Sequence, residues 1–310
     1  MDRASAVGNI AAARALAAAG NIDGAIARLE ATLKEAPDDS TTLAMLAAYE
    51  LQRGNTVQAE AAAQASLKAD PDSAFGYRVL GIIEQTRQHY DFAETHFRKA
   101  VEIDPDEPYH HFHLARILAA RNKRDEAEVE FRAAIELAPG ESTLLAGYAD
   151  MLAAKGELDE AEALADQALD VDPDDNDVLV TKGDVALRRG RLDEATEFAL
   201  WALQRDATDR NAISLLAQIK MRRNPILGLW WRWATWMESF GGWKAWAVVI
   251  AIYFAFQVFR RSVLIHFPPV AQTIVIFAWV GFAILTWIGP SILRWMINAE
   301  LKRVRLRPDF

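Results

Sequence analysis

The chain has 310 residues, a formal net charge of −9 at pH 7 and no cysteine, which excludes disulfides, zinc sites built on thiolates and cysteine nucleophiles. Its charge is unevenly distributed, since residues 1–209 hold 21 basic and 40 acidic side chains, whereas residues 210–310 hold 13 and 3. The acidic front part is expected to repel phosphates, so we expect no nucleic-acid partner.

A turn that contains proline recurs every 34 residues. The prolines are Pro37, Pro71, Pro105, Pro139 and Pro173, and Ala207 takes this place in a sixth copy. A fixed period in this range predicts a solenoid of stacked units, none of which can bury its apolar face alone. Counting back from the prolines gives six units, which are residues 6–39, 40–73, 74–107, 108–141, 142–175 and 176–209.

Each unit is predicted to form a helix, a short turn and a second helix. The turn carries residues that tolerate a left-handed backbone, which are Gly20, Gly54, Asn122, Gly156 and Gly190. Three residues later comes an aspartate that we expect to cap the second helix, as Asp23, Asp91, Asp125, Asp159 and Asp193. In three units a glutamate follows at the spacing of a capping box, as Glu94, Glu128 and Glu162.

Small residues recur where the two helices of a unit must approach closely. They are Ala25, Ala59, Ala93, Ala127, Ala161 and Ala195. The best unit, 74–107, resembles the tetratricopeptide repeat (TPR) family at Tyr77, Leu80, Gly81, Ala93, Phe97, Ala100 and Pro105. The resemblance covers residues 1–209 and implies an all-α superhelical solenoid. Residues 210–224 continue the pattern of a first helix and are predicted to cap the array.

The resemblance also implies that the concave groove lined by the first helices binds a protein partner. The candidate groove residues are Phe75, Arg78, Ile82, Gln85, Tyr109, Phe112, His113 and Arg116. Aromatic side chains beside arginines are typical of binding hot spots. The alternative is that Phe75 and Tyr109 only pack between units. Ile82 and Arg116 stand where the family's carboxylate-clamp members have asparagine, so we expect no clamp of that sort.

Beyond Pro225 the composition becomes apolar and rich in tryptophan. Residues 225–242 predict an amphipathic helix in a bilayer interface, although its tryptophan face could instead pack on the solenoid. Residues 243–296 predict a transmembrane hairpin with crossings at about 243–264 and 270–290, or else a re-entrant hairpin. The predicted interface residues are Trp230, Trp233, Trp236, Phe240, Trp243, Trp246, Arg260 and Arg261.

Basic residues flank the outer ends of this hairpin and fill a basic tail at 297–310. The positive-inside rule therefore predicts that the solenoid and the C-terminus lie in the cytoplasm. We expect the membrane to be the inner membrane of a bacterium, from the alanine- and arginine-rich composition.

Few residues invite a catalytic or metal interpretation. His110 and His113 lie three apart on a predicted helix, but no third ligand completes a metal site. We therefore expect a protein that is not an enzyme and has no cofactor. The leading hypothesis is a membrane-anchored scaffold that binds a protein partner, as an accessory subunit or assembly factor of an integral membrane complex. The alternative is a membrane-remodelling or pore-forming oligomer built on the C-terminal hairpin.

Overall fold

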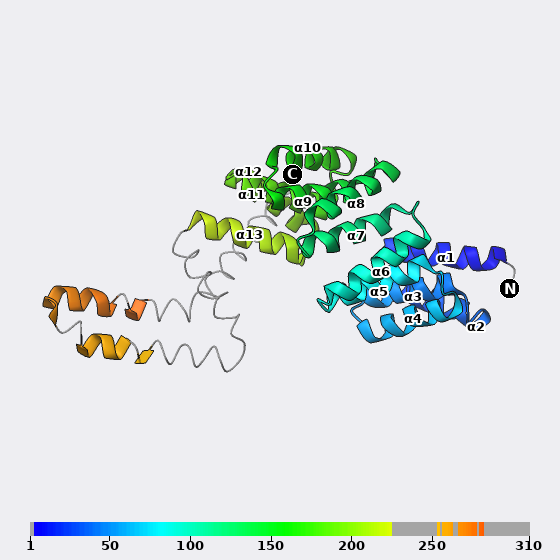
Figure 1. The fold of residues 1–310 in the computed structure, drawn as a ribbon, viewed down its shortest axis with the longest axis horizontal. Helices are drawn as coiled ribbons and strands as arrows, with labels where there is room; N and C mark the ends of the chain where they lie inside the picture. The colour runs from blue at the N-terminus through cyan, green and yellow to red at the C-terminus, as the bar shows by residue number, and fades with distance from the viewer. Residues whose placement is uncertain (1–2, 225–252, 255, 263–265, 278, 282–310) are drawn as a thin grey trace. The chain divides into compact units, whose positions relative to one another are not determined.

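The computed structural model describes residues 3–224, 253–254, 256–262, 266–277 and 279–281. Within residues 3–224 the chain is all-α and forms thirteen helices (Figure 1). They are α1 (Arg3–Ala18), α2 (Ile22–Glu35), α3 (Ser40–Gln52), α4 (Thr56–Ala69), α5 (Ala74–Thr86), α6 (Tyr90–Ile103), α7 (Pro108–Ala120), α8 (Arg124–Leu137), α9 (Ser142–Lys155), α10 (Leu158–Val171), α11 (Asn176–Arg188), α12 (Leu192–Arg205) and α13 (Arg210–Arg223).

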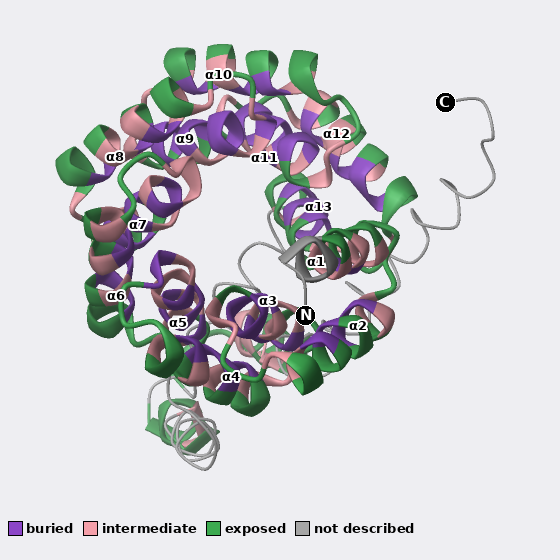
Figure 2. Ribbon diagram, turned by 90° about the vertical axis from the view of Figure 1, so that its right-hand side faces the viewer, coloured by how far each residue is buried: buried purple, intermediate pink, exposed green. Residues whose placement is uncertain are grey.

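The chain divides into two compact units. The first, Met1–Asp172, contains α1 to α10, and the second, Pro173–Phe310, contains α11 to α13. In the first unit the helices form consecutive antiparallel pairs, with α3, α5, α7 and α9 on the inner side and α4, α6, α8 and α10 on the outer side (Figure 2). In the second unit α11 pairs with α12, and α13 packs against both.

The repeated turns work locally as the sequence predicts. Each proline directly follows the C-cap residue of a second helix, where its missing N–H costs no helical hydrogen bond. The next first helix then begins after a polar cap; for example, the backbone N–H of Thr42 donates to Asp39 at 2.9 Å. All five predicted left-handed residues have positive φ, from 63° at Asn122 to 96° at Gly156. In the unit without such a residue, Gln88 adopts φ 64° in the same place.

The prediction that aspartates cap the second helices is wrong. The cap follows the left-handed residue at once, so it is Asn21 in the first pair, and Asp23 falls inside the first turn of α2. The same shift applies to Asp91, Asp125, Asp159 and Asp193. A carboxylate in the first turn still interacts favourably with the helix dipole. Asp23, Asp91 and Asp193 each also pair with an arginine of the next repeat.

Ion pairs connect consecutive helix pairs along one edge of the stack. A basic residue recurs every 34 residues at the end of the first helices, as Arg53, Arg87, Arg121, Lys155, Arg189 and Arg223. Arg53 bonds to Asp23 at 3.0 Å, Arg87 to Glu60 at 2.6 Å and Lys155 to Glu128 at 3.0 Å, each acid belonging to the preceding pair. Arg121 pairs with Asp91, and Arg223 pairs with Asp193. We call this series the ion-pair ladder.

Two of the glutamates predicted for capping boxes belong to this ladder instead. Glu94 accepts hydrogen bonds from Lys123 at 2.7 Å and from Arg98 at 2.8 Å, and it also contacts Arg121. Glu128 accepts from Arg132 at 2.7 Å as well as from Lys155. Since neither glutamate lies at the third position of its helix, neither could reach back to the cap residue.

The six small residues at the helix crossings are all fully buried, as predicted. Ala25, Ala59, Ala93, Ala127, Ala161 and Ala195 each have 0% exposure. Larger side chains such as Phe97 and Phe131 fill the space beside them. The apolar core therefore runs between the inner and outer helices of each pair.

Little of the C-terminal part lies in the described residues. The predicted interfacial helix 225–242, its tryptophans, Trp243, Trp246 and the basic tail 297–310 lie outside them. The described segments 256–262 and 269–277 are helical, and the rings of Phe256 and Trp279 stack at 4.2 Å with an angle of 6°. Arg260 and Arg261 are exposed. None of the described helices combines the length and the apolar character that a membrane crossing needs.

Candidate functional site

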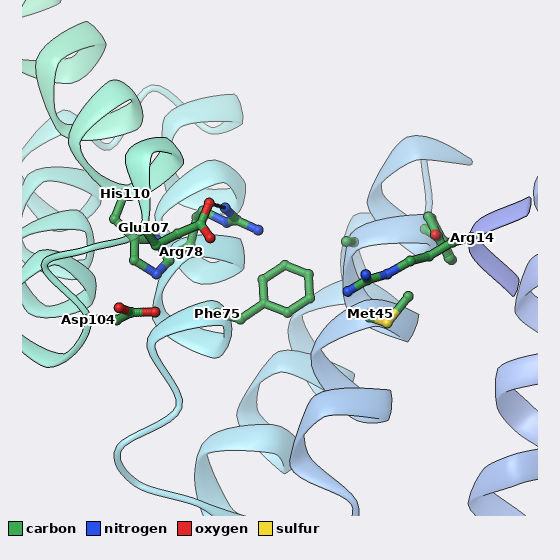
Figure 3. Close-up of a pocket in the computed structure, with 9 residues that line it drawn as sticks. Arg14, Met45, Phe75, Arg78, Asp104, Glu107 and His110 are labelled. Atoms are coloured by element: carbon green, nitrogen blue, oxygen red, sulfur yellow. Dashed lines mark ion pairs between the residues drawn. The ribbon is translucent and has the colours of Figure 1, made fainter. Parts of the chain in front are cut away.

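Two adjoining hollows open among α1, α3, α5 and α7 of the first unit. The first has a volume of about 340 Å³ and is lined by Arg14, Met45, Ala48, Tyr49, Phe75, Arg78, Asp104, Glu107 and His110 (Figure 3). The second has a volume of about 510 Å³ and is lined by Ala48, Leu51, Gln52, Phe75, Arg78, Val79, Ile82, Tyr109 and His113. Because the hollows share Ala48, Phe75 and Arg78, they form one surface, which we call the groove.

Arg78 stands where the two hollows meet. It lies one helical turn after Phe75 on α5, so the two side chains share a face, and its guanidinium sits 4.6 Å from the centre of the Phe75 ring. The Tyr109 ring of α7 approaches the same guanidinium at 6.0 Å. Glu107, whose carboxylate also caps α7, lies 3.6 Å from Arg78. Two neighbouring helices therefore hold this cation in place.

The charge of Arg78 is largely shielded from water. Its side chain is 20% exposed, and burial lowers the pKa of its guanidinium, while Glu107 opposes this shift. An arginine stays protonated despite such a shift. The groove therefore contains a permanent positive charge whose hydration is already partly lost.

The two histidines that line the groove are neutral at physiological pH. Burial lowers the pKa of His110 to about 4 and that of His113 to about 3, and the nearby Arg78 adds to both shifts. The Nδ1 atoms of both rings are buried and have no hydrogen-bond partner among the residues that the structure describes. The His113 ring stacks on Phe97 at 5.4 Å. These rings therefore contribute apolar surface rather than charge.

Tyr109 is fixed by a contact to the next helix pair. Its hydroxyl donates to Glu141 at 2.8 Å, and burial followed by this hydrogen bond raises the pKa of Tyr109 to about 12. The ring thus remains neutral and oriented beside Arg78. Tyr109 both contacts the next pair and lines the second hollow. The packing between units is therefore present, and partner binding by this ring stays a prediction.

The structure brings five of the eight predicted groove residues together: Phe75, Arg78, Ile82, Tyr109 and His113 line the hollows. Gln85 is half-buried and is not among the lining residues. Phe112 is 5% exposed and packs edge-on against Phe131 of α8, so it belongs to the core of its own helix pair. Arg116 is exposed and lies 5.5 Å above the Phe112 ring.

Sequence reasoning missed the α1 and α3 side of the groove. Met45, Ala48 and Leu51 occupy the same repeat positions in unit 40–73 that were used to choose residues in the two following units. Applying these positions to one more unit would have found them. Arg14 carries no such signal, because it comes from the opposite wall, where it extends toward Phe75 (Figure 3).

The groove combines the permanent cation of Arg78 with neutral histidine rings and apolar side chains. His111, next to the groove histidines in sequence, is instead bonded to Glu130 at 2.6 Å and to the Pro105 carbonyl at 2.9 Å. Within the described residues no group of three or more His, Cys, Asp or Glu side chains is placed to hold a metal ion.

Several solved structures share the fold. The Cut9–Hcn1 hetero-tetramer of APC/C matches with a TM-score of 0.60 and 16% identity over 69% of this chain, which spans 42% of that chain's length. TTC0263, a TPR protein of Thermus thermophilus, matches with a TM-score of 0.53 and 25% identity over 59% of this chain and 99% of its own. The type IV pilus biogenesis factor PilW matches with a TM-score of 0.55 and 16% identity over 68% and 98%.

No curated protein matches the sequence significantly. A family model for the tetratricopeptide repeat matches residues 10–74, 79–142 and 148–210, which together are more than half of the chain. These matches cover most of each helix pair described above, and Phe75 and Arg78 of the groove fall between the first two matches. The chain therefore belongs to the tetratricopeptide repeat family.

Proposed function

We propose that this chain is a scaffold that binds a protein partner in the groove between α3, α5 and α7. The observation that carries the proposal is the pair of hollows joined at Phe75 and Arg78. An arginine stacked on aromatic rings and surrounded by apolar side chains is typical of binding hot spots. Both hollows lie on first helices, whose positions are fixed by the core beneath them.

The proposal is tested by isolating the full chain in mild detergent and identifying what co-purifies. Ile82→Glu places a charge in the second hollow, whereas the control Val57→Glu changes an outer-surface valine that is 73% exposed. We expect the partner to be lost from the first variant and kept by the control. Equal recovery with both variants would show that the groove is not the binding surface. One stoichiometric partner indicates an accessory subunit or assembly factor, and many substoichiometric partners indicate an adaptor.

We further propose that the C-terminal part attaches the scaffold to a lipid bilayer. The support comes from the apolar sequence beyond Pro225 and from apolar side chains in the described segments that face outward. Val270 and Phe277 are each 71% exposed, and Val258 and Ile274 are each 63% exposed. The stacked Phe256 and Trp279 join the two segments as a hairpin would. Lipid hydrocarbon would cover these side chains at no cost in hydration.

Flotation of the full chain with phospholipid vesicles tests this attachment. Val258→Asp with Ile274→Asp adds two charges to the outward-facing side of the hairpin, and the control Val57→Asp with Val129→Asp adds two charges to exposed solenoid valines. We expect only the first pair of changes to abolish flotation. Flotation that persists in both proteins would argue against the hairpin as the attachment. Leakage of vesicle contents on binding would favour the pore-forming alternative.

The orientation proposed for the attached protein places the solenoid and the C-terminus in the cytoplasm of a bacterium, on the inner membrane. Basic residues at Lys220, Arg222 and Arg223 and in the tail 297–310 support this side. Because the chain has no cysteine, a single cysteine introduced at Val57 reports its own accessibility in intact cells. If a reagent that does not cross the inner membrane labels Val57→Cys, the solenoid lies outside the cytoplasm, which is the opposite of the proposed orientation.

A further inference from the structure

The guanidinium of Arg78 has unused hydrogen-bonding capacity. Arginine carries five N–H donors, and among the described residues no acceptor lies within hydrogen-bond distance of those of Arg78. Glu107, at 3.6 Å, is close enough to interact electrostatically but does not accept a hydrogen bond. The aromatic rings of Phe75 and Tyr109 contact the guanidinium but accept no strong hydrogen bond. A ligand that supplies acceptor oxygens would therefore gain more here than at a hydrated surface arginine.

The surroundings limit the charge that this ligand can carry. Asp104 and Glu107 line the first hollow together with Arg14 and Arg78, and His110 is neutral, so the wall is close to electrically balanced. A carboxylate has one charge and a planar pair of oxygens that matches the guanidinium fork. A phosphate carries nearly two charges, and the second would be repelled by Asp104 and Glu107. The balance favours a carboxylate.

The second hollow indicates which kind of side chain the ligand carries next to that carboxylate. Leu51, Val79 and Ile82 line it, and the uncharged rings of Tyr109 and His113 close it. Among the described residues that line this hollow, Arg78 is the only charged one. An aliphatic or aromatic side chain placed here would be removed from water while its neighbour remains at Arg78.

We propose that the groove binds a peptide segment in which an aspartate or glutamate contacts Arg78 and an adjacent apolar side chain fills the hollow lined by Leu51, Val79 and Ile82. This inference rests on the proposed scaffold function. It names the chemistry of the partner segment, which the fold alone does not specify.

The test is selection from a library of random 12-residue peptides displayed on phage, with the full chain in mild detergent as the target. Peptides that also bind the Ile82→Glu variant are discarded. The enriched peptides are then synthesised, and their affinities for the wild-type chain are measured by fluorescence polarisation. We expect enrichment of an acidic residue next to an apolar one. Replacing the acid of the peptide by its amide should weaken binding about 10- to 100-fold.

A double-mutant cycle assigns that loss to Arg78. In Arg78→Met, which keeps an apolar stem for stacking, the acidic peptide and its amide version should bind equally weakly. Arg78→Lys keeps the charge without the planar fork and should recover part of the difference. Arg132→Met, at an outer-helix arginine that is 61% exposed, is the control and should bind like the wild type. Circular dichroism checks that each variant is folded.

The alternatives give different results. Enriched peptides without an acid, whose binding survives Arg78→Met but not Ile82→Glu, would overturn the assignment and leave the scaffold function standing. Tighter binding of a matched phosphoserine peptide would show that the group at Arg78 is a phosphate and not a carboxylate. Loss of binding when the C-terminus of the peptide is amidated would show that the carboxylate is that of a chain end. If no selected peptide binds the wild-type chain more tightly than the Ile82→Glu variant, the result would count against both proposals.

Discussion

Gly81 of α5 lies directly against the ring of Phe97 of α6. A Cβ atom on Gly81 would stand 2.5 Å from Cε1 of Phe97, which is much closer than any van der Waals contact. Phe97 is fully buried, so its ring has no open space into which it could move. The missing side chain at Gly81 is therefore a requirement of packing within this helix pair.

We expect Gly81→Ala to lower the free energy of unfolding by about 1–3 kcal/mol, because the added methyl group overpacks the core. Urea denaturation followed by circular dichroism measures the effect. Gly140→Ala is the control, since nothing lies within 4 Å of a Cβ at that position. Equal stability of the two variants would show that the Phe97 ring relaxes more easily than the structure implies.

Glu94 interacts with three cations in the ion-pair ladder. Its side chain is 7% exposed, and it faces Arg98, Arg121 and Lys123. Glu94→Gln should lower the free energy of unfolding by about 1–3 kcal/mol, because partly buried cations lose a charged acceptor. The matched control, Glu102→Gln, alters a carboxylate that is 69% exposed and should change stability little. Similar losses in both variants would mean that the ladder contributes no more than surface charge.

Acid should destabilise the fold through the groove histidines. Their folded pKa values, about 4 for His110 and about 3 for His113, lie below the ordinary value of 6.5. The unfolded chain therefore binds protons that the folded chain excludes, so stability is lost as the pH falls from about 6.5 toward 3. In His113→Gln this loss should be smaller than in the wild-type chain, and an equal loss in both proteins would show that His113 does not cause it. The free energy of unfolding is measured from denaturation curves at pH values from about 4 to 7, the range in which histidines titrate.

His111 should titrate in the opposite direction. The hydrogen bond to Glu130 raises the pKa of His111 above its ordinary value, against the effect of burial. The stabilisation that protonated His111 gives the fold is therefore complete below the pKa of this residue in the unfolded chain. It is lost as the pH rises through the pKa of His111 in the folded chain. Glu130→Gln should lower the pKa of His111, as followed by NMR of the ring protons. An unchanged titration would show that the Pro105 carbonyl, and not Glu130, sets the shift.

Much of the fold could be predicted from the sequence because its signals are local. A left-handed residue, a proline after a helix end and a small residue at a crossing each act within a few positions, and the 34-residue period repeats them. The predicted caps were wrong by two residues, because only the backbone geometry after Gly20 decides that Asn21 and not Asp23 caps α2. The basic residues of the ion-pair ladder can be recognised in the sequence by their 34-residue recurrence. Their acidic partners lie 27 to 30 residues away, and which acids they are depends on how the helix pairs stack.

The composition of the groove was decided only by the tertiary structure. Arg78 and Phe112 occupy the same position in successive units, yet Arg78 lines the groove and Phe112 is buried. The next unit differs at the equivalent place, where Gly147 leaves room for the Phe112 ring, whereas the residue beside Arg78 is His113, which lines the same hollow. The repeat therefore determined where each helix lies. The volumes of residues on neighbouring units determined which side chains line the groove.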